Sequence, residues 1–323
     1  MGHFQKPILL SLLLGIGLYF GAMFISDFQA TRAAISQVGI TGWLIILGLS
    51  LVNYGLRYWR WEWYLRLLTN IKLPRYLHLS YYLCGFALST TPGKAGETVR
   101  SLYLKRHGVG YANTISNFFV ERFQDLLSIV LLASLAAVLF DGYGIVVVLT
   151  AMLVITALPV LHSRWLPAML DKLSLKLPQK LAAATVHLKQ LIQSSAALLK
   201  NRQLLGGMVI GFVAWFAEAV GFWYLLTLLN QDVTFVAAVG IYGVAVLVGA
   251  VSFLPGGLGS TEAVMGLLLI SLGVDKSIAV AATLICRIAT LWFAVFIGVG
   301  VAGFLATKGI TPVFQKTSAE QDV

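Results

Sequence analysis

Two copies of a helix-breaking motif constrain this chain more than any other feature. Both lie in apolar stretches, and they read PGKAGE at residues 92–97 and PGGLGSTE at residues 255–262. An arginine follows the glutamate that ends each copy by 25 residues, Arg122 in the first case and Arg287 in the second, so the pairs are offset by 165 residues. A duplicated Pro-Gly break with a matched acid and base is typical of membrane transporters whose interrupted helices form a central site.

The chain carries too little charge for a water-soluble globule. Charged residues make up 11% of its 323 residues and hydrophobic residues 59%, and the mean hydropathy is +0.86. Apolar runs of spanning or near-spanning length predict transmembrane helices. These runs are Leu9–Ile25, Trp43–Leu56, Leu126–Phe140, Ile145–Leu161, Leu204–Leu229 and Ser277–Ala306. The sequence therefore predicts an all-α integral membrane protein.

The basic residues predict its orientation. Lysine and arginine gather in three segments, which are 57–75, 105–106 and 164–202. The connections that nearly lack them are 27–30, 141–144 and 230–232. Basic segments stay in the cytoplasm, so we expect a multi-pass protein of a bacterial cytoplasmic (inner) membrane with both termini cytoplasmic. This orientation accounts for the net charge of +10, and we expect no nucleic-acid partner.

Two segments cannot cross the membrane in this orientation. Residues 78–106 must leave and return on the basic side, and residues 234–275 on the opposite side. We expect both to be re-entrant helical hairpins that break at the Pro-Gly turns. Non-helical backbone is tolerated at membrane depth only where protein or a water-filled cavity covers it. The hairpin tips are therefore expected to meet near the middle of the membrane.

The resulting prediction is an inverted repeat of two halves, each with three spanning helices and one re-entrant hairpin. The first half is residues 1–140 and the second is residues 141–310. The expected spans are Pro7–Ser26, Thr41–Tyr64, Tyr111–Phe140, Tyr143–Leu161, Leu204–Leu229 and Ser277–Ala306. Amphipathic helices are expected over 164–202 at the inner interface, interrupted at Pro178. Residues 311–323 are expected to form a disordered tail.

The arginine of each repeat is the first candidate for substrate binding. Arg122 and Arg287 lie about ten residues into their spans, roughly 15 Å deep at 1.5 Å per residue. Arginine remains charged there and offers a planar fork of donors that suits phosphate. The alternative is structural pairing, of Arg122 with Asp125 and of Arg287 with Glu262 or Glu218.

Several acidic residues are further candidates. Glu121 and Asp125 share one helix face, so their mutual repulsion favours a proton on one of them and suggests proton coupling. The alternative is a salt-bridge network around Arg122 that fixes helix packing. Glu218 interrupts a charge-free span, where it either lines a cavity or is a neutral, hydrogen-bonded structural residue.

The two turns suggest an anion site made of backbone amides. Glu97 and Glu262 begin the second half-helices, as simple caps or as substrate contacts, and Lys94 lies inside the first turn. Free amides at such helix starts bind anions. The residues expected to build this backbone are Pro92, Gly93, Gly96, Pro255, Gly256, Gly257 and Gly259. Close helix packing is the alternative role for the glycines.

The remaining motifs give weaker indications of a binding or catalytic site. Residues 57–63, RYWRWEW, are typical of an interfacial belt that anchors the protein or grips lipid head groups. Cys84 and Cys286 are expected to be free packing thiols. We find no metal-ligand spacing and no cofactor motif, and therefore expect no metal, no cofactor and no catalysis.

At these motifs the chain resembles the lysylphosphatidylglycerol synthase transmembrane region, also called the flippase-like domain family. The matching residues are Pro92-Gly93 through Glu97, Glu121-Arg122 with Asp125, and Pro255 through Glu262. The resemblance implies a domain that moves lipids between leaflets, in some members fused to a soluble aminoacyl-transfer domain. No such domain follows Ala306 in this sequence, so we do not expect synthase activity.

The leading hypothesis is a translocase for a phospholipid or a polyprenyl-phosphate-linked lipid. Its head group would enter a polar cavity between the two halves, and alternating access would follow from rocking one half against the other. A membrane-embedded enzyme that acts on a lipid phosphate and a proton-coupled transporter of small solutes or ions are the alternatives. Membrane lipids are the expected partners, and a second copy of the chain or a lipid-modifying enzyme stays open.

Overall fold

The computed structural model describes residues 28–137, 165–174 and 179–313, with a few residues between 145 and 163. The described residues form helices joined by short turns, and they contain no β-strand. The prediction of an all-α protein is therefore confirmed for this part of the chain.

Three elements that the sequence predicts lie wholly or mostly outside the described residues. The span Pro7–Ser26 lies outside the described residues, as do most of the span Tyr143–Leu161 and most of the tail.

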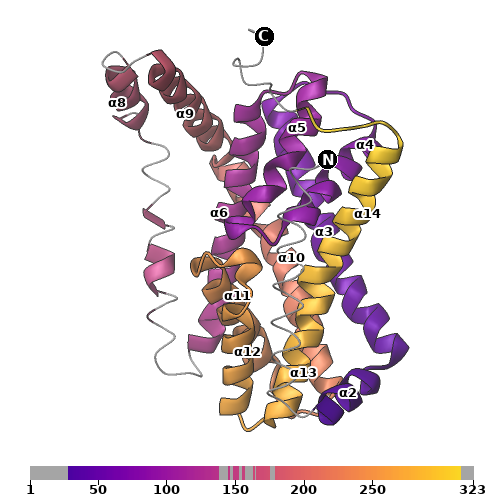
Figure 1. Cartoon of the computed structure of the whole chain (residues 1–323). Coiled ribbons are helices and arrows are strands. Elements are labelled where there is room, and N and C mark those ends of the chain that lie inside the picture. Colours follow the sequence, from indigo (N-terminus) through magenta and orange to yellow (C-terminus); the bar gives the residue numbers. More distant parts are fainter. Residues whose placement is uncertain are drawn as a thin grey trace.

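Twelve α-helices run through the described part (Figure 1). They are α2 (Phe28–Gln37), α3 (Gly39–Leu68), α4 (Arg75–Cys84), α5 (Arg100–Leu104), α6 (Tyr111–Ala137), α8 (Trp165–Ser174), α9 (Gln179–Leu198), α10 (Asn201–Leu228), α11 (Phe235–Val251), α12 (Ser260–Ser271), α13 (Lys276–Arg287) and α14 (Phe293–Thr307). Short 3-10 segments join some of them: η1 (Gly85–Leu88), η2 (Pro92–Val99), η3 (Lys105–His107) and η4 (Pro255–Gly257). A π-helical segment, η5 (Ile288–Trp292), links α13 to α14.

Three helical stretches among the described residues are long and apolar enough to cross a membrane. They are α3, α10 and the continuous stretch from α13 to α14, Lys276–Thr307. Helix α6 is similar in length, with 27 residues, but it carries Glu121, Arg122 and Asp125 near its middle. These four elements coincide with four of the six expected spans.

Large apolar side chains cover the outside of the long helices. Leu44 on α3 is 67% exposed, Leu205 on α10 is 64% exposed and Phe296 on α14 is 64% exposed. Several contiguous exposed side chains of this kind on a soluble monomer would drive association. A hydrocarbon surround removes that penalty, so the exterior agrees with an integral membrane protein.

Both Pro-Gly motifs interrupt the helices, as the sequence predicts. Gly93 has φ 58° and ψ 16°, and Gly256 has φ 62° and ψ 12°, so the two turns bend in nearly the same way. This left-handed conformation suits glycine, which has no Cβ to clash. Lys94 adopts it too, with φ 56°. Four segments, α4, η1, η2 and α5, form the first broken hairpin, whereas α11, η4 and α12 form the second.

Local capping sets where the second hairpin's helices begin. The Thr234 side chain accepts from the backbone N–H of Ala237 at the start of α11, at 3.3 Å. The Glu262 carboxylate accepts from the backbone N–H of Gly259 at the start of α12, at 2.7 Å. Such caps replace hydrogen bonds that the first turn of a helix cannot make internally.

The two hairpins lie toward opposite ends of the long helices and meet at their turns. Figure 1 shows α4 and α5 at one end and α12 toward the other. Segments η2 and η4 are in contact, and a Cβ at Gly256 would lie 3.3 Å from the Cα of Thr90. Each hairpin also packs on a long helix from the other half of the chain, α11 on α6 and α4 with η1 on α14.

Small residues make these hairpin contacts close. A Cβ at Gly243 of α11 would lie 2.4 Å from the backbone nitrogen of Ala133 in α6. A Cβ at Gly298 of α14 would lie 2.1 Å from the backbone nitrogen of Ala87 in η1. Glycine and alanine let backbones approach in this way, and dispersion contacts then hold the helices together in the membrane.

Helices α8 and α9 form a pair beside α6. The Lys189 ammonium contacts the Asp171 carboxylate at 2.7 Å and joins the two helices. The Ser116 hydroxyl of α6 donates to the carbonyl of Leu191 in α9 at 3.1 Å. Helices therefore form within 164–202 as expected, Pro178 lies outside the described residues, and their placement at the inner membrane surface stays a prediction.

The close contact at Gly298 generates a test of the packing. Gly298→Ala is expected to lower the free energy of unfolding by about 1–3 kcal/mol, because the added carbon collides with the η1 backbone. Gly300→Ala on the same helix is the control, since no atom lies within 4 Å of a Cβ there. Thermal unfolding in detergent measures both, and equal melting temperatures would contradict the packing.

Candidate functional site

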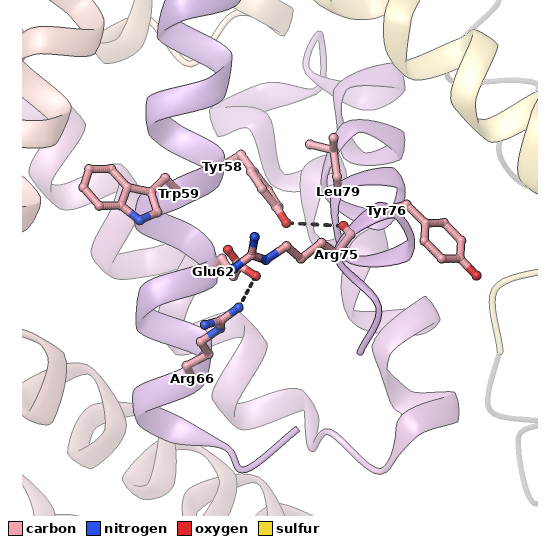
Figure 2. Close-up of a pocket in the computed structure, with 7 residues that line it drawn as sticks. All are labelled: Tyr58, Trp59, Glu62, Arg66, Arg75, Tyr76 and Leu79. Carbon is pink, nitrogen blue, oxygen red and sulfur yellow. Dashed lines mark hydrogen bonds and ion pairs between the residues drawn. The ribbon is translucent and has the colours of Figure 1, made fainter. Parts of the chain in front are cut away.

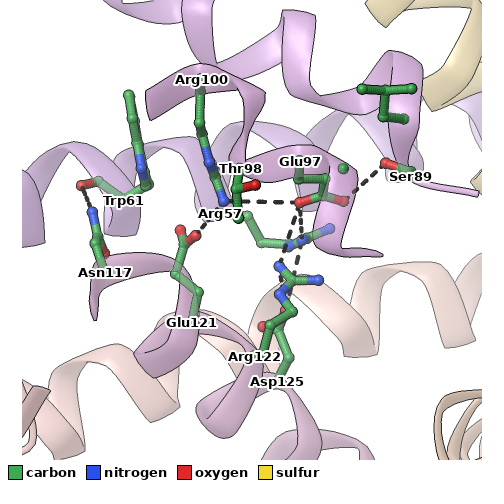
Figure 3. Close-up of polar contacts among 12 residues, drawn as sticks. Arg57, Trp61, Ser89, Glu97, Thr98, Arg100, Asn117, Glu121, Arg122 and Asp125 are labelled. Carbon is green, nitrogen blue, oxygen red and sulfur yellow. Dashed lines mark hydrogen bonds and ion pairs between the residues drawn. The ribbon is translucent and has the colours of Figure 1, made fainter. Parts of the chain in front are cut away.

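Seven ionisable side chains meet where α3, α6 and the first broken hairpin come together (Figure 3). We call this set the central charge cluster, and its members are Arg57, Arg60, Glu97, Arg100, Glu121, Arg122 and Asp125. Figure 3 labels all of them except Arg60. Six of them are at most 3% exposed as residues. The Arg122 side chain is the seventh and is 19% exposed. A charged group in such surroundings requires partners, because desolvation disfavours an isolated charge.

Asp125 contacts three guanidinium groups. Its Oδ1 accepts a hydrogen bond from Nη2 of Arg60. Its Oδ2 lies 2.9 Å from Nη2 of Arg122 and 3.6 Å from Nη2 of Arg57. Since Arg57 and Arg60 come from α3, this single carboxylate ties α3 to α6.

Glu97 stands close to three guanidinium groups without hydrogen bonding to them. Its Oε2 lies 4.0 Å from Arg57, 3.8 Å from Arg100 and 3.9 Å from Arg122. The other oxygen, Oε1, accepts from the hydroxyl of Ser89 at 2.8 Å. The carboxylate therefore balances the charge of the arginines at the hairpin turn from just beyond hydrogen-bond distance.

Several polar atoms of the cluster lack hydrogen-bond partners among the described residues. Such donors are Nε and Nη2 of both Arg57 and Arg122, and such acceptors are Oε2 of Glu97 and Oδ2 of Asp125. The Nη2 atoms and these oxygens lie within ion-pair distance of one another, but they form no hydrogen bond. Buried polar groups are nearly always satisfied in folded proteins. A polar species bound between these side chains would satisfy them.

Arg100 is held by an acid on one side and by aromatic rings on the others. Its Nη2 donates to Oε2 of Glu121 at 2.8 Å. Its guanidinium carbon lies 5.3 Å from the ring centre of Trp61, 5.0 Å from that of Tyr82 and 5.7 Å from that of Phe118. Cation–π attraction strengthens in such desolvated surroundings, so these contacts hold Arg100 in place although its Nε makes no hydrogen bond among the described residues.

The charges of the cluster do not cancel. Four guanidinium groups face three carboxylates, which leaves one positive charge in excess when all are ionised. Lys94 adds to this excess, because its ammonium lies 5.5 Å from the Trp215 ring and Arg57 lies 5.6 Å from the same ring. A buried site with surplus positive charge and free donors is suited to an anion.

Glycines on α10 make room for the buried arginine of α3. The Gly207 carbonyl accepts from Nη1 of Arg60 at 3.3 Å. A Cβ at Gly211 would lie 2.5 Å from the same nitrogen. Helix α10 therefore closes over the cluster because it has no side chains at these two positions.

Arg287 and Glu262 form a second charged group at the other hairpin. Nε of Arg287 donates to Oε1 of Glu262 at 2.7 Å, and Nη2 donates to the Gly256 carbonyl at 2.6 Å. The π-helical η5 begins directly after Arg287, and the Tyr54 hydroxyl of α3 donates to the Thr290 carbonyl there. The arginine of each repeat thus contacts the glutamate of its own motif, but Arg287 does so much more closely than Arg122.

Glu218 is buried on α10 and accepts a hydrogen bond from the Tyr242 hydroxyl of α11. A small cavity of about 10 Å³ adjoins it, and Ser50, Cys286 and Thr290 are among its other lining residues. That volume matches one water molecule. Glu218 is therefore both hydrogen-bonded and beside a polar space, so neither of its two sequence interpretations is excluded.

The backbone amides of the two turns are mostly occupied. The N–H of Gly96 donates to Thr91 Oγ1 at 2.7 Å, that of Gly257 donates to the Leu254 carbonyl at 2.9 Å, and that of Gly259 donates to Glu262. These three amides do not face a ligand in this conformation. An amide-lined anion site stays a prediction for the turns at Gly93 and Gly256.

The structure brings five predicted residues together and adds three that the sequence interpretation missed. Arg122, Glu121, Asp125 and Glu97 share the central charge cluster, with Lys94 at its edge. Arg57 and Arg60 were assigned to an interfacial belt and Arg100 was not assigned, yet all three are buried in the cluster. The belt interpretation is therefore wrong for both α3 arginines and for Trp61, which is fully buried.

A charge count along the sequence would have signalled the missing arginines. Three acids, Glu97, Glu121 and Asp125, fall near one expected midplane arginine, so further cations were needed from a neighbouring span. The expected pairing of Arg122 with Asp125 is present at 2.9 Å. The described residues contain no group of three or more His, Cys, Asp or Glu side chains arranged for a metal ion.

Comparison with known proteins agrees with this picture. The sequence pattern of the lysylphosphatidylglycerol synthase TM region matches residues 8–298. A UPF0104 membrane protein of Pyrococcus horikoshii is 23% identical over 242 residues, which cover 66% of this chain and 72% of that protein. Another, from Methanothermobacter thermautotrophicus, is 27% identical over 112 residues, covering 34% of this chain and 33% of that protein.

A third relative carries a biochemical name. A phosphatidylglycerol lysyltransferase of Staphylococcus epidermidis is 32% identical over 96 residues, which cover 30% of this chain but only 11% of that enzyme. This likeness is partial, whereas the family pattern spans most of the sequence. The chain is therefore a helical membrane protein that belongs to the family of the lysylphosphatidylglycerol synthase transmembrane region.

Proposed function

We propose that the chain is a translocase that moves a phosphate-containing lipid between leaflets, with the central charge cluster as its head-group site. The observation that carries this proposal is the set of guanidinium donors on Arg57 and Arg122 that make no hydrogen bond among the described residues, in a site with surplus positive charge. Arginine stays protonated in any such site. An anion that enters the membrane is therefore the ligand that completes it.

The chemistry of membrane lipids narrows the anion to phosphate. A phosphodiester brings one negative charge and acceptor oxygens in a geometry that guanidinium groups match through paired hydrogen bonds. The hydrocarbon part of the lipid would remain in the membrane interior, where the apolar exterior of the helices meets it. A phospholipid and a polyprenyl-phosphate-linked lipid both meet this description. The name of the Staphylococcus epidermidis relative refers to phosphatidylglycerol, itself a phosphodiester lipid.

The proposed roles follow from the contacts. Arg57 and Arg122 bind the phosphate, whereas Glu97 and Asp125 orient them and keep them charged. Lys94 supplies further positive charge at the turn.

The remaining candidates have supporting roles. Arg287 with Glu262 forms the corresponding pair in the second half, and Glu121 and Glu218 are the candidates for proton coupling. The glycines of the two turns, Gly93 and Gly256, bend the backbone that closes the site.

The proposal includes an inverted repeat with two re-entrant hairpins. Three features support it: the equal spacing of the motifs, the matching backbone angles of the two Pro-Gly turns, and the exchange of packing in which each hairpin contacts a long helix of the other half. The protein would then sit in a bacterial inner membrane with both termini in the cytoplasm. Membrane lipids are the proposed partners, and we propose no catalytic step.

Neutralising the phosphate-binding arginines tests the function. Arg57→Gln and Arg122→Gln are each expected to slow lipid transfer by about ten- to a hundredfold, since each removes charged hydrogen bonds worth roughly 1.5–3 kcal/mol. Transfer of a fluorescent phospholipid across proteoliposome leaflets measures this. Arg106→Gln is the control, because Arg106 is exposed and lies outside the cluster. Full transfer by both cluster variants would refute this site.

Accessibility labelling tests the hairpin topology. Single cysteines at Tyr76 and Gly108, the flanks of the first hairpin, are expected to react from one side of the membrane with an impermeant maleimide. Cysteines at Gln231 and Gly273, the flanks of the second, are expected to react from the other side. The background carries Cys84→Ala and Cys286→Ala, since both native thiols are buried and free. Labelling of one hairpin's two flanks from opposite sides would mean that this hairpin crosses the membrane.

A further inference from the structure

A groove of about 450 Å³ opens between α3 and α4, away from the central charge cluster (Figure 2). Its lining residues are Tyr58, Trp59, Glu62, Arg66, Arg75, Tyr76 and Leu79. They come from the last turns of α3 and the first turns of α4, so the groove lies near one end of a membrane-spanning helix.

The groove combines a polar floor with an apolar rim. Trp59 is 58% exposed, Tyr76 72% and Leu79 37%. Tryptophan and tyrosine gather at membrane–water interfaces, where one part of the ring is apolar and another is polar. The rim therefore suits the boundary between head groups and hydrocarbon.

The charge inside the groove is positive. Nη2 of Arg66 donates to Oε1 of Glu62 at 2.6 Å, which compensates that carboxylate. Figure 2 shows Arg75 extending into the groove toward the same acid. No ion pair within 4 Å involves Arg75 among the described residues, so one guanidinium charge is left uncompensated. A single phosphodiester carries the matching charge.

A layer of aromatic rings separates the groove from the central charge cluster. Tyr58 in the groove wall lies 6.0 Å from His78 and 5.6 Å from Tyr82, centre to centre. Tyr82 and Trp61 in turn lie against the Arg100 guanidinium. The groove and the cluster are thus distinct sites with one layer of side chains between them.

We propose that this groove binds the head group of an anionic phospholipid at the basic end of α3. Arg66 and Arg75 donate to the phosphodiester, and Trp59, Tyr76 and Leu79 contact the glycerol region and the first carbons of the chains. Snorkelling arginine beside an aromatic rim supports both contacts at once. The groove holds lipid whether or not the central charge cluster transports it.

Photo-crosslinking in nanodiscs tests the groove. The probe is a phosphatidylglycerol analogue with a photoactivatable group near the ester of its acyl chain, and mass spectrometry maps the labelled peptides. The full chain is expected to be labelled within residues 58–79. Arg66→Gln/Arg75→Gln is expected to reduce that labelling about tenfold, as loss of charged contacts does.

A matched control removes the same charge elsewhere. Arg106 and Arg202 are exposed and do not line the groove, so Arg106→Gln/Arg202→Gln is expected to change labelling by less than about twofold. Thermal unfolding of both double variants checks that each is folded. An equal loss of labelling in the two double variants would overturn the proposal.

Two further arms identify the ligand. A diacylglycerol probe without phosphate is expected to label residues 58–79 weakly, and labelling as strong as that of the phospholipid would overturn the proposal. Soluble glycerol phosphate at millimolar concentration is expected not to compete, and full competition would indicate a site for soluble anions instead.

Arg122→Gln separates this proposal from the transport proposal. This variant is expected to retain labelling in the groove although its lipid transfer is slow. Loss of groove labelling in Arg122→Gln would show that the two sites are not independent and would contradict the inference.

Discussion

The attraction between Asp125 and the guanidinium groups around it is the interaction on which this fold most depends. Helices α3 and α6 carry charges on the faces that they turn toward each other. Exposing either charged face to hydrocarbon would cost free energy, so the two faces are stable only when they pair. Asp125 holds Arg60 by a hydrogen bond and lies within ion-pair distance of Arg57 and Arg122. Removal of one partner from such a buried group leaves the others uncompensated, and that penalty exceeds the value of any single contact.

This arrangement also explains why stability and ligand binding are not competing interpretations of the cluster. Arg60 and Arg100 each donate a hydrogen bond to an acid and are closely packed, although Nε of each lacks a partner among the described residues. Arg57 and Arg122 lie within reach of acids but keep donors without partners. In the proposed function, Arg60 and Arg100 hold the helices together, whereas Arg57 and Arg122 bind the lipid phosphate.

The sequence was most informative where a residue type dictates backbone shape. Pro92-Gly93 and Pro255-Gly256 predicted helix breaks, and both turns are present with nearly equal angles. Long apolar runs predicted α3, α10 and the stretch from α13 to α14 for the same reason. These features are local, because a proline or an uninterrupted apolar run acts on its own segment whatever lies beside it.

The sequence was least informative about partners contributed by other helices. Arg57 and Arg60 follow an apolar run and sit among tryptophans, a pattern equally typical of an anchoring belt. The burial of Arg60 depends on Gly207 and Gly211 of α10, far away in the chain, and Arg57 lies 5.6 Å from the ring of Trp215 on the same helix. The amides of the turns were expected to bind an anion, but Thr91 and Glu262, within or beside the same motifs, accept from Gly96 and Gly259 instead.

The close approach of backbones at Gly243 and Gly298 determines which helices of the protein can move together as one rigid body. Because α11 packs against α6, and η1 packs against α14, each half of the sequence contacts a broken hairpin of the other half. Rotating one half of the sequence away from the other would break both of these packing contacts. In the proposed transport cycle, each moving body would therefore combine helices from both halves of the sequence, and the hinge between the bodies would not coincide with the midpoint of the chain.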